Sequence, residues 1–223
     1  MGKNQINDKV KLIYPSNKEI CNVWAVGKEK VIFIDCGIDK YYSKIIENLK
    51  KENIPYPSYI LITHCHFDHA LSAHLFEKNG SKIISHIYTK NALEKDIYKI
   101  WPENPSIVKK TNVEISFSAD ISLNLCEFEI TFLHTPGHTP GSSSYLIKID
   151  EEKYLFTGDL FFADGNVGWK GSIDFSKHDL KKNLEKIKNI DFNFILPGHG
   201  KILDKIKGVK MLEKAIKNCE NPL

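Results

Sequence analysis

The chain has 223 residues, of which 42% are hydrophobic, and its 31 lysines and 28 acidic residues leave a net charge of only +3. This composition suits one globular domain over residues 1–223, and the interspersed charges provide no basic tract of the kind that binds nucleic acid. No apolar run approaches the roughly 20 residues that a membrane-spanning helix needs, so we expect no membrane partner.

The first half of the chain alternates strand and helix patterns. Short runs of β-branched and aromatic residues predict strands at 10–15, 22–26, 31–34, 59–63 and 82–87. Apolar residues at helical spacing predict a helix that Asp39 caps and that ends before Pro55, and a second helix over 68–78. Prolines in 96–112 argue against regular structure, which predicts a loop or a short irregular helix over the mouth of a site.

The second half repeats this alternation. We predict strands at 121–125, 128–133, 143–149, 154–157 and 192–196. Helices are expected over 177–190, with Ser176 as the N-cap, and from about Lys205. Without an internal repeat or a low-complexity linker, the simplest interpretation is one compact α/β domain.

The cysteines indicate a reducing compartment. The chain has five of them, an odd number without a CxxC pair, so no disulfide framework is expected. The N-terminal residues are polar and lack the apolar core of a signal peptide. We therefore expect a cytoplasmic protein.

The most informative segment is Thr63-His64-Cys65-His66-Phe67-Asp68-His69, directly after a predicted strand. Alternate side chains of an extended segment point the same way, so His64 and His66 can share one metal ion. Asp68 and His69 follow where the chain turns into a helix and can reach a second ion nearby. Imidazole and carboxylate ligands suit zinc and other borderline metals.

Further candidate ligands follow three downstream strands, each in a turn rich in Gly or Pro. His138 lies in His-Thr-Pro-Gly-His, Asp159 in Thr-Gly-Asp and His199 in Pro-Gly-His-Gly. Turns at strand ends are where α/β folds place functional side chains. The sequence therefore predicts a metal centre to which loops from both halves of the chain contribute.

In this order, HCHFDH, HTPGHT, TGD and PGHG resemble the metallo-β-lactamase superfamily over nearly the whole chain. The resemblance implies a four-layer αβ/βα sandwich with the metals at one edge. It implies that His64, His66 and His138 hold one metal, that Asp68, His69 and His199 hold the other, and that Asp159 bridges both. It also implies that Asp35 supports the site through a hydrogen bond to a ligand.

The chemistry expected of this site is hydrolysis. Two divalent cations, zinc by default with iron or manganese as alternatives, lower the pKa of a water molecule so that hydroxide is available near neutral pH. That hydroxide attacks the carbonyl carbon of a small-molecule thioester, ester or lactone. Among the ligands, we take the carboxylates Asp68 and Asp159 as catalytic residues. No Ser or Cys nucleophile is required.

Details of the motifs narrow the branch of the superfamily. The carboxylate of Asp159 argues against true β-lactamases, and HTPGHTPGSSSY resembles glyoxalase II, the hydroxyacylglutathione hydrolases, and the persulfide dioxygenases. The chain lacks the helical extension with which glyoxalase II binds glutathione, so we do not expect glutathione as the substrate. Phe162 stands where many acyl-homoserine lactonases have a Tyr. The alternative to a two-metal hydrolase is a mononuclear non-haem iron dioxygenase acting on persulfides.

A candidate substrate-binding residue lies in the loop after Asp159. Both related families place Gly-Arg there, whereas this chain has Gly168-Trp169-Lys170 and contains no arginine at all. Lys170 is therefore the nearest candidate to bind an anionic part of the substrate, with a looser hold than a guanidinium fork gives. The alternative is that Lys170 is one more solvated lysine.

Overall fold

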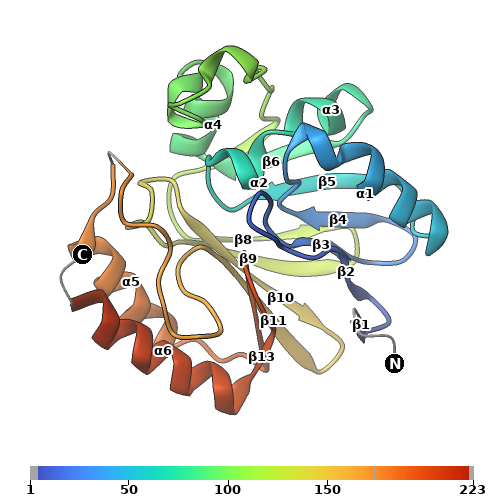
Figure 1. Cartoon of the computed structure of the whole chain (residues 1–223). Helices are drawn as coiled ribbons and strands as arrows, with labels where there is room; N and C mark the ends of the chain where they lie inside the picture. Colours follow the sequence, from blue (N-terminus) through green and yellow to red (C-terminus); the bar gives the residue numbers. More distant parts are fainter. Residues whose placement is uncertain (1–4, 173, 221–223) are drawn as a thin grey trace. The chain divides into compact units, whose positions relative to one another are not determined.

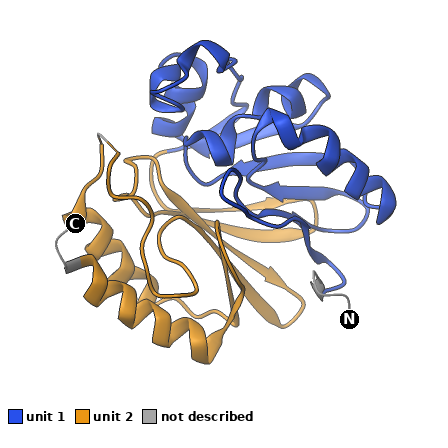
Figure 2. Ribbon diagram, in the orientation of Figure 1, with its two compact units in different colours: residues 1–117 blue, residues 118–223 orange. Residues whose placement is uncertain are grey.

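The computed structural model describes residues 5–172 and 174–220. The chain divides into two compact units, residues 1–117 and residues 118–223, drawn in blue and orange in Figure 2. Each unit has one β-sheet and its own helices (Figure 1). The assignment of all 223 residues to a single domain stays a prediction.

The first unit is built on a seven-stranded sheet whose strands follow one another in chain order. Strands β1 to β4 pair antiparallel, and β4 to β7 pair parallel. The strands are β1 Gln5–Asn7, β2 Val10–Tyr14, β3 Val23–Val26, β4 Val31–Ile34, β5 Pro57–Ile62, β6 Lys82–His86 and β7 Ile115–Phe117. The helices are α1 Asp39–Lys51, α2 Phe67–Ala70, α3 Ala73–Lys78, α4 Ile87–Glu94, η1 Ile97–Lys99 and η2 Pro105–Ile107.

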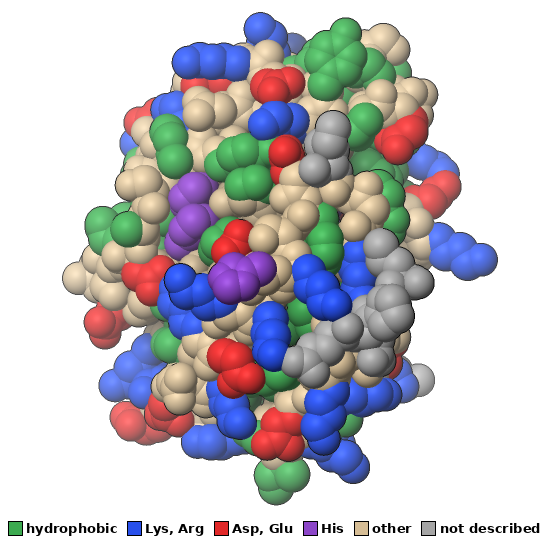
Figure 3. Space-filling model, turned by 90° about the vertical axis from the view of Figure 1, so that its left-hand side faces the viewer, with side chains coloured by type: hydrophobic (Ala, Val, Ile, Leu, Met, Phe, Trp, Pro, Cys, Tyr) green, Lys and Arg blue, Asp and Glu red, His purple; other side chains and the backbone are tan. Residues whose placement is uncertain are grey.

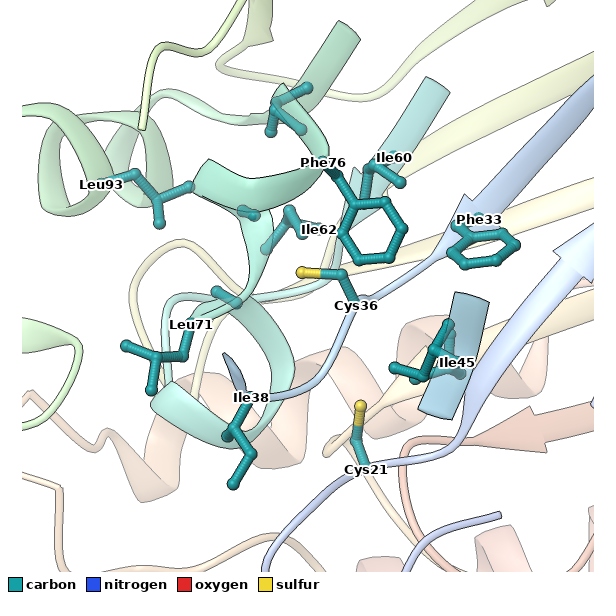
Figure 4. Close-up of a cluster of buried hydrophobic side chains, with 14 of the residues drawn as sticks. Cys21, Phe33, Cys36, Ile38, Ile45, Ile60, Ile62, Leu71, Phe76 and Leu93 are labelled. Carbon is teal, nitrogen blue, oxygen red and sulfur yellow. The ribbon is translucent and has the colours of Figure 1, made fainter. Parts of the chain in front are cut away.

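The core of the first unit forms where helices cover the central strands. Helix α1 buries Ile45 and Leu49 against the sheet, and Phe33 and Phe76 meet edge to face with their ring centroids 5.6 Å apart. Figure 4 shows Phe33, Ile45 and Phe76 in this cluster. Burial of such side chains typically contributes about 1.5–3 kcal/mol each. The strand ends that carry the candidate ligands are therefore held by a well-packed base.

Two helix predictions in this unit are corrected by the structure. Ile38, not Asp39, is the N-cap of α1, and Asp39 is the first helical residue. The helix expected over 68–78 is two short helices, because a turn at Leu71 and Ser72 separates α2 from α3. Helix α4 was not predicted at all. Its apolar periodicity is weak, and its N-cap is His86, whose Nδ1 accepts a hydrogen bond from the Tyr88 amide.

The second unit has a six-stranded sheet in the order β13-β12-β11-β10-β9-β8. All its pairs are antiparallel except β11 with β12, which is parallel. The strands are β8 Ile121–Leu125, β9 Phe128–His134, β10 Ser143–Ile149, β11 Glu152–Gly158, β12 Phe194–Pro197 and β13 Leu203–Asp204. The helices are α5 Lys177–Lys188 and α6 Lys205–Glu220, which lie side by side in Figure 1.

The helices of the second unit bury their apolar faces in a common cluster with the sheet. Leu180 and Leu184 of α5 and Leu212 of α6 pack with Leu155 and Ile195 of β11 and β12. The predicted cap of α5 is confirmed, because Ser176 Oγ accepts a hydrogen bond from the Asp179 amide at 3.2 Å. This unit therefore agrees closely with the strands and helices predicted for it.

Lysines and acidic side chains are interspersed on the face drawn in Figure 3. Within the described residues, no helix is both long enough and apolar enough to cross a membrane.

Candidate metal centre

Four predicted ligands of the first unit gather just beyond the end of β5. The ring centroids of His64 and His66 are 4.8 Å apart, and those of His64 and His69 are 4.1 Å apart. Asp68 Oδ2 lies 3.6 Å from His69 Nε2. His66 is the extended residue before α2, and the one-turn helix brings His69 back beside His64. The turn from strand to helix therefore concentrates imidazole and carboxylate groups in one place, as the motif predicts.

Asp35 lies behind this cluster. It follows β4, which is parallel to β5, so both strands end at the same edge of the sheet. Its Oδ1 accepts a hydrogen bond from the Thr63 amide at 2.7 Å, and its Oδ2 accepts one from Thr63 Oγ1 at 2.8 Å. His69 Nδ1 is 2.7 Å from the same Oδ2. The structure therefore has the predicted hydrogen bond between Asp35 and a predicted ligand, with His69 Nδ1 as the donor.

These hydrogen bonds decide which nitrogen of each ring faces a metal. Asp35 can only accept, so His69 Nδ1 carries the proton and donates it. Thr63 Oγ1 donates its only hydrogen bond to Asp35. The same oxygen can therefore only accept from His64 Nδ1, at 3.1 Å. In both rings Nε2 is therefore the unprotonated nitrogen, which is the form that binds a metal.

Asp35 adopts a backbone conformation that most residues avoid. Its φ is +58°, in the left-handed region that Asn and Asp tolerate better than other non-glycine residues. The cost of about 1–3 kcal/mol is offset by four hydrogen bonds, three to the side chain and one from the Asp35 amide to the Leu61 carbonyl. Strain of this kind is concentrated at functional sites.

The second unit brings its three predicted ligands to one sheet edge. Asp159 follows β11 and His199 follows β12, and these two strands are parallel. His138 lies in the connection from β9 to β10, and because β10 is antiparallel to β11 that connection lies at the same edge. The Gly198 amide donates to the Gly158 carbonyl at 2.8 Å, which ties two of the loops together.

Asp159 presents its two carboxylate oxygens to two different imidazoles. Its Oδ2 is 3.8 Å from His138 Nε2, and its Oδ1 is 3.7 Å from His199 Nε2. Asp159 is largely buried, with 10% of its side chain exposed, and His138 is 1% exposed. A carboxylate oriented in this way can bind a cation through each oxygen.

The loop after Asp159 fixes the orientation of His138. The Trp169 carbonyl lies 3.1 Å from His138 Nδ1, and since a carbonyl only accepts, Nδ1 donates and Nε2 remains unprotonated. Gly168 makes this approach possible. A Cβ atom there would lie 2.5 Å from the Asp159 carbonyl oxygen and 2.8 Å from His138 Nδ1. The absence of a side chain at residue 168 therefore lets the loop pack against two predicted ligands.

Lys170 lines a cavity between the loop after Asp159 and α6. The cavity has a volume of about 460 Å³ and is lined by Asn166, Val167, Lys170 and Asn218. Lys170 Nζ donates to the Asn218 carbonyl at 3.5 Å, near the C-terminal end of α6, where a cation also interacts favourably with the helix dipole. The prediction that Lys170 binds substrate stays a prediction.

Two buried cysteines lie close to the histidine cluster. Cys21 and Cys36 are free thiols with no exposed surface, and the Cys36 amide donates to the His69 carbonyl at 2.9 Å. Burial raises the pKa of the Cys21 thiol to about 12, so it stays protonated at neutral pH. Both thiols are part of the buried core of the first unit.

The donor atoms fit divalent metal ions. Each ion-pair distance from an Nε2 atom to a carboxylate oxygen, 3.6 to 3.8 Å, is too long for a hydrogen bond. With zinc-ligand bonds of about 2.1 Å, two ligand atoms of one tetrahedral ion lie about 3.4 Å apart. Two atoms bound to the same ion can be at most about 4.2 Å apart, when they lie on opposite sides of it. The spacing within each unit is therefore that of atoms sharing an ion.

The comparisons with known proteins identify the family. A family model described as the metallo-beta-lactamase superfamily matches residues 17–199. A probable metallo-hydrolase of Methanocaldococcus jannaschii is 30% identical over 196 residues, which cover 83% of this chain and 90% of that protein. The chain therefore belongs to the metallo-beta-lactamase superfamily, as a metal-binding hydrolase.

Two further relatives add detail. A hydroxyacylglutathione hydrolase of Haemophilus influenzae is 29% identical over 153 residues, which cover 63% of this chain and 68% of that protein. The crystal structure of a B3 metallo-beta-lactamase is similar with a TM-score of 0.76 and 25% identity, covering 91% of this chain and 96% of the other. The α/β fold of the metallo-β-lactamase type predicted from the sequence is confirmed.

Sequence reasoning missed two contributors to the site. Thr63 connects Asp35 with His64, and its place directly before the first ligand was the available signal. The Trp169 carbonyl is a backbone group, and any residue type could supply it. Only the glycine before it hinted at a close approach.

Proposed function

We propose that the protein is a hydrolase with a dinuclear metal site that cleaves a thioester, ester or lactone. The cations are zinc in this proposal, and when bound they lower the pKa of water and polarise the substrate carbonyl. We further propose that the protein works in the cytoplasm on a small molecule.

The proposed ligand sets divide the seven side chains between two ions. One ion takes the three imidazoles of His64, His66 and His138. The other takes Asp68, His69 and His199. Asp159 is shared between them.

The orientation of Asp159 is the observation that carries this proposal. Its two oxygens lie at similar distances from the Nε2 atoms of His138 and His199, which belong to different ligand sets. A carboxylate that bound a single ion would need to face only the imidazole of that ion, whereas Asp159 faces both. Asp159 is therefore the residue best placed to hold two ions at a fixed separation, as two-metal hydrolysis requires.

The hydrogen bonds behind the predicted ligands are expected to hold these side chains in the form that binds a cation. Asp35 and the Trp169 carbonyl hold His69 and His138 with Nε2 unprotonated, so neither imidazole has to reorganise when a cation binds. Such preorganisation also lets the catalytic carboxylates Asp68 and Asp159 keep their orientation during the reaction.

The substrate class rests on chemistry and on one relative. The hydroxyacylglutathione hydrolase of Haemophilus influenzae is named for cleavage of a thioester-type substrate, and the match covers 63% of this chain. Because this chain has no arginine, it offers no bidentate guanidinium for a carboxylated substrate. We propose a thioester, ester or lactone whose recognition does not depend on such a contact.

Metal analysis beside a hydrolysis screen tests the proposal. Protein reconstituted with zinc is expected to hold two ions per chain and to hydrolyse at least one of a set of thioesters, esters and lactones. A stoichiometry of one iron with oxygen consumption on a persulfide would overturn it in favour of the dioxygenase. Two bound ions without hydrolysis of any compound in the three classes would show that the substrate class is wrong.

A further inference from the structure

A cavity of about 400 Å³ lies in the first unit beside the ligand motif. This volume is within the range of small-molecule sites. Five apolar side chains from three parts of the unit line it: Ile38, Phe67, Leu71, Trp101 and Ile107. Ile38 and Leu71, labelled in Figure 4, are at most 7% exposed and form its floor.

The cavity begins one residue away from two predicted metal ligands. Phe67 stands between His66 and Asp68 in the chain, and its ring stacks on Trp101 with the centroids 4.3 Å apart. The stack joins α2 to the segment between η1 and η2. The cavity and the predicted ligands His66 and Asp68 therefore share one short segment of the chain.

The charged side chains around the cavity cancel. Lys40 Nζ is 2.8 Å from Glu19 Oε2, and the remaining pair, Lys18 and Asp39, brings the sum for the lining residues to zero. A binding site for a charged group would show an excess of one sign, as complementarity requires. The lining therefore favours an uncharged, apolar group.

Asp39 adds one specific polar feature. Its Oδ1 is buried and has no hydrogen-bond partner within the described residues, while its Oδ2 lies 3.6 Å from His74 Nε2. A buried acceptor without a partner is unfavourable, so a ligand that donates a hydrogen bond to it gains affinity. The acceptor belongs to the first residue of α1, and this residue lines the cavity.

We propose that this cavity binds an uncharged apolar arm of the substrate and that Asp39 Oδ1 accepts a hydrogen bond from an O–H or N–H group on that arm. The proposal rests on the hydrolase function proposed above, because it names the part of the substrate that lies beside the reacting carbonyl. The arm can belong to the acyl part or to the leaving group, and the experiment distinguishes the two.

Two series of uncharged thioesters provide the test, one with acyl chains of two to eight carbons and one with leaving thiols of the same lengths. Burial of methylenes is expected to raise kcat/KM roughly 3- to 4-fold per carbon in one series, up to the length that fills the cavity. The series that responds identifies the arm. Flat profiles in both series, from an enzyme that does hydrolyse thioesters, would overturn the proposal while leaving the hydrolase function intact.

A variant that fills the cavity shows whether the dependence on substrate chain length arises there. Ile107 is 48% exposed, so Ile107→Trp is expected to fold normally and to narrow the cavity from its rim. For the longest chain, kcat/KM of this variant should be at least 5-fold below that of the wild type. For the two-carbon substrate, kcat/KM should change less than 2-fold. Ile206→Trp is the matched control, because Ile206 is 84% exposed on α6 and lines no part of the cavity. Equal profiles for the two variants would overturn the proposal.

The role of Asp39 is tested with arms that end in a hydroxyl or a methyl group. The ratio of kcat/KM for the hydroxyl arm to that for the methyl arm is expected to be about 3- to 10-fold higher in the wild type than in Asp39→Ala, because the variant loses one hydrogen bond to the hydroxyl. Asp179→Ala controls for the loss of an acidic residue in the first turn of a helix. If both variants keep the wild-type preference, Asp39 does not contact the arm.

Discussion

His69 Nδ1 lies 2.7 Å from Asp35 Oδ2, and both side chains are almost completely buried. Asp35 directly follows β4 and His69 lies in α2, the short helix after β5, so a parallel strand pair positions the acceptor and the donor. The hydrogen bond holds the imidazole with Nε2 directed at Asp68. A residue 34 positions away in the chain thus determines how a predicted ligand meets its metal.

Substitution of Asp35 by asparagine should weaken metal binding without unfolding the protein. Asn tolerates the left-handed backbone of residue 35 and keeps the size of the side chain. Its amide nitrogen cannot accept from His69 Nδ1, so the ring loses its fixed tautomer. Changes of this kind typically cost about 10- to 100-fold in metal affinity. Competition with a chromophoric chelator measures the change.

The control for this variant has the same backbone conformation. Asp150→Asn lies at φ +54° on an exposed turn far from any predicted ligand in its unit. Its metal affinity should equal that of the wild type. Equal affinities for both variants and the wild type would show that Asp35 does not position His69.

Asp159→Ala is expected to remove nearly all hydrolytic activity and at least one metal ion while leaving the fold intact. Asp159 supplies an oxygen to each of two imidazole partners, so its loss should exceed the 10- to 100-fold effect of an outer contact. Asp191→Ala removes an exposed carboxylate that only pairs with lysines and should be neutral. Wild-type activity with full metal content in the Asp159 variant would show that the bridge is misplaced.

The candidate ligands could be picked out from the sequence because each lies in, or just after, a recognisable turn that follows a strand. Parallel pairing of β4 with β5, and of β11 with β12, then brings these turns together within each unit. Other features had no such signature. The break at Leu71 and Ser72 interrupts an apolar pattern that reads as one continuous helix. The Trp169 carbonyl and the buried Asp39 oxygen depend on tertiary packing, which spacing along the chain does not encode.

Gly168→Ala should lower metal affinity through His138. The added Cβ would lie 2.8 Å from His138 Nδ1 and 2.5 Å from the Asp159 carbonyl oxygen, so the loop has to move and the hydrogen bond from His138 to Trp169 is lost. We expect a decrease of about 10- to 100-fold, and a changed visible spectrum after cobalt substitution. The spectrum reports ligand geometry, which a loss of stability alone would not alter.

A second glycine in the same unit gives the control. Gly208 lies within α6, and a Cβ there would meet the tip of the Ile195 side chain at 2.9 Å and the Phe192 ring at 3.1 Å, with no predicted ligand among its three nearest contacts. Alanine also favours helix by about 1 kcal/mol relative to glycine. Gly208→Ala should therefore keep the wild-type affinity and cobalt spectrum. Identical spectra for both variants would contradict a positioning role for the Trp169 loop.

Substitution of Lys170 tests whether the protein binds a negatively charged part of its substrate. If this ammonium binds an anionic group remote from the reacting carbonyl, Lys170→Ala should mainly raise KM. A contact of roughly 1–2 kcal/mol corresponds to about 5- to 30-fold for a carboxylated substrate, while a neutral ester should be almost unaffected. The structure offers a competing role, because Lys170 Nζ donates to the Asn218 carbonyl near the end of α6.

The two roles of Lys170 separate in a paired measurement. A structural tether would lower stability and change KM equally for charged and neutral substrates, since neither substrate would touch the ammonium. Lys210→Ala, on the exposed face of α6, controls for the loss of one positive charge from the surface. A selective rise in KM for the carboxylated substrate in the Lys170 variant alone would assign an anion-binding role. Equal, small changes for both substrates would leave Lys170 as a contact between the loop and the helix.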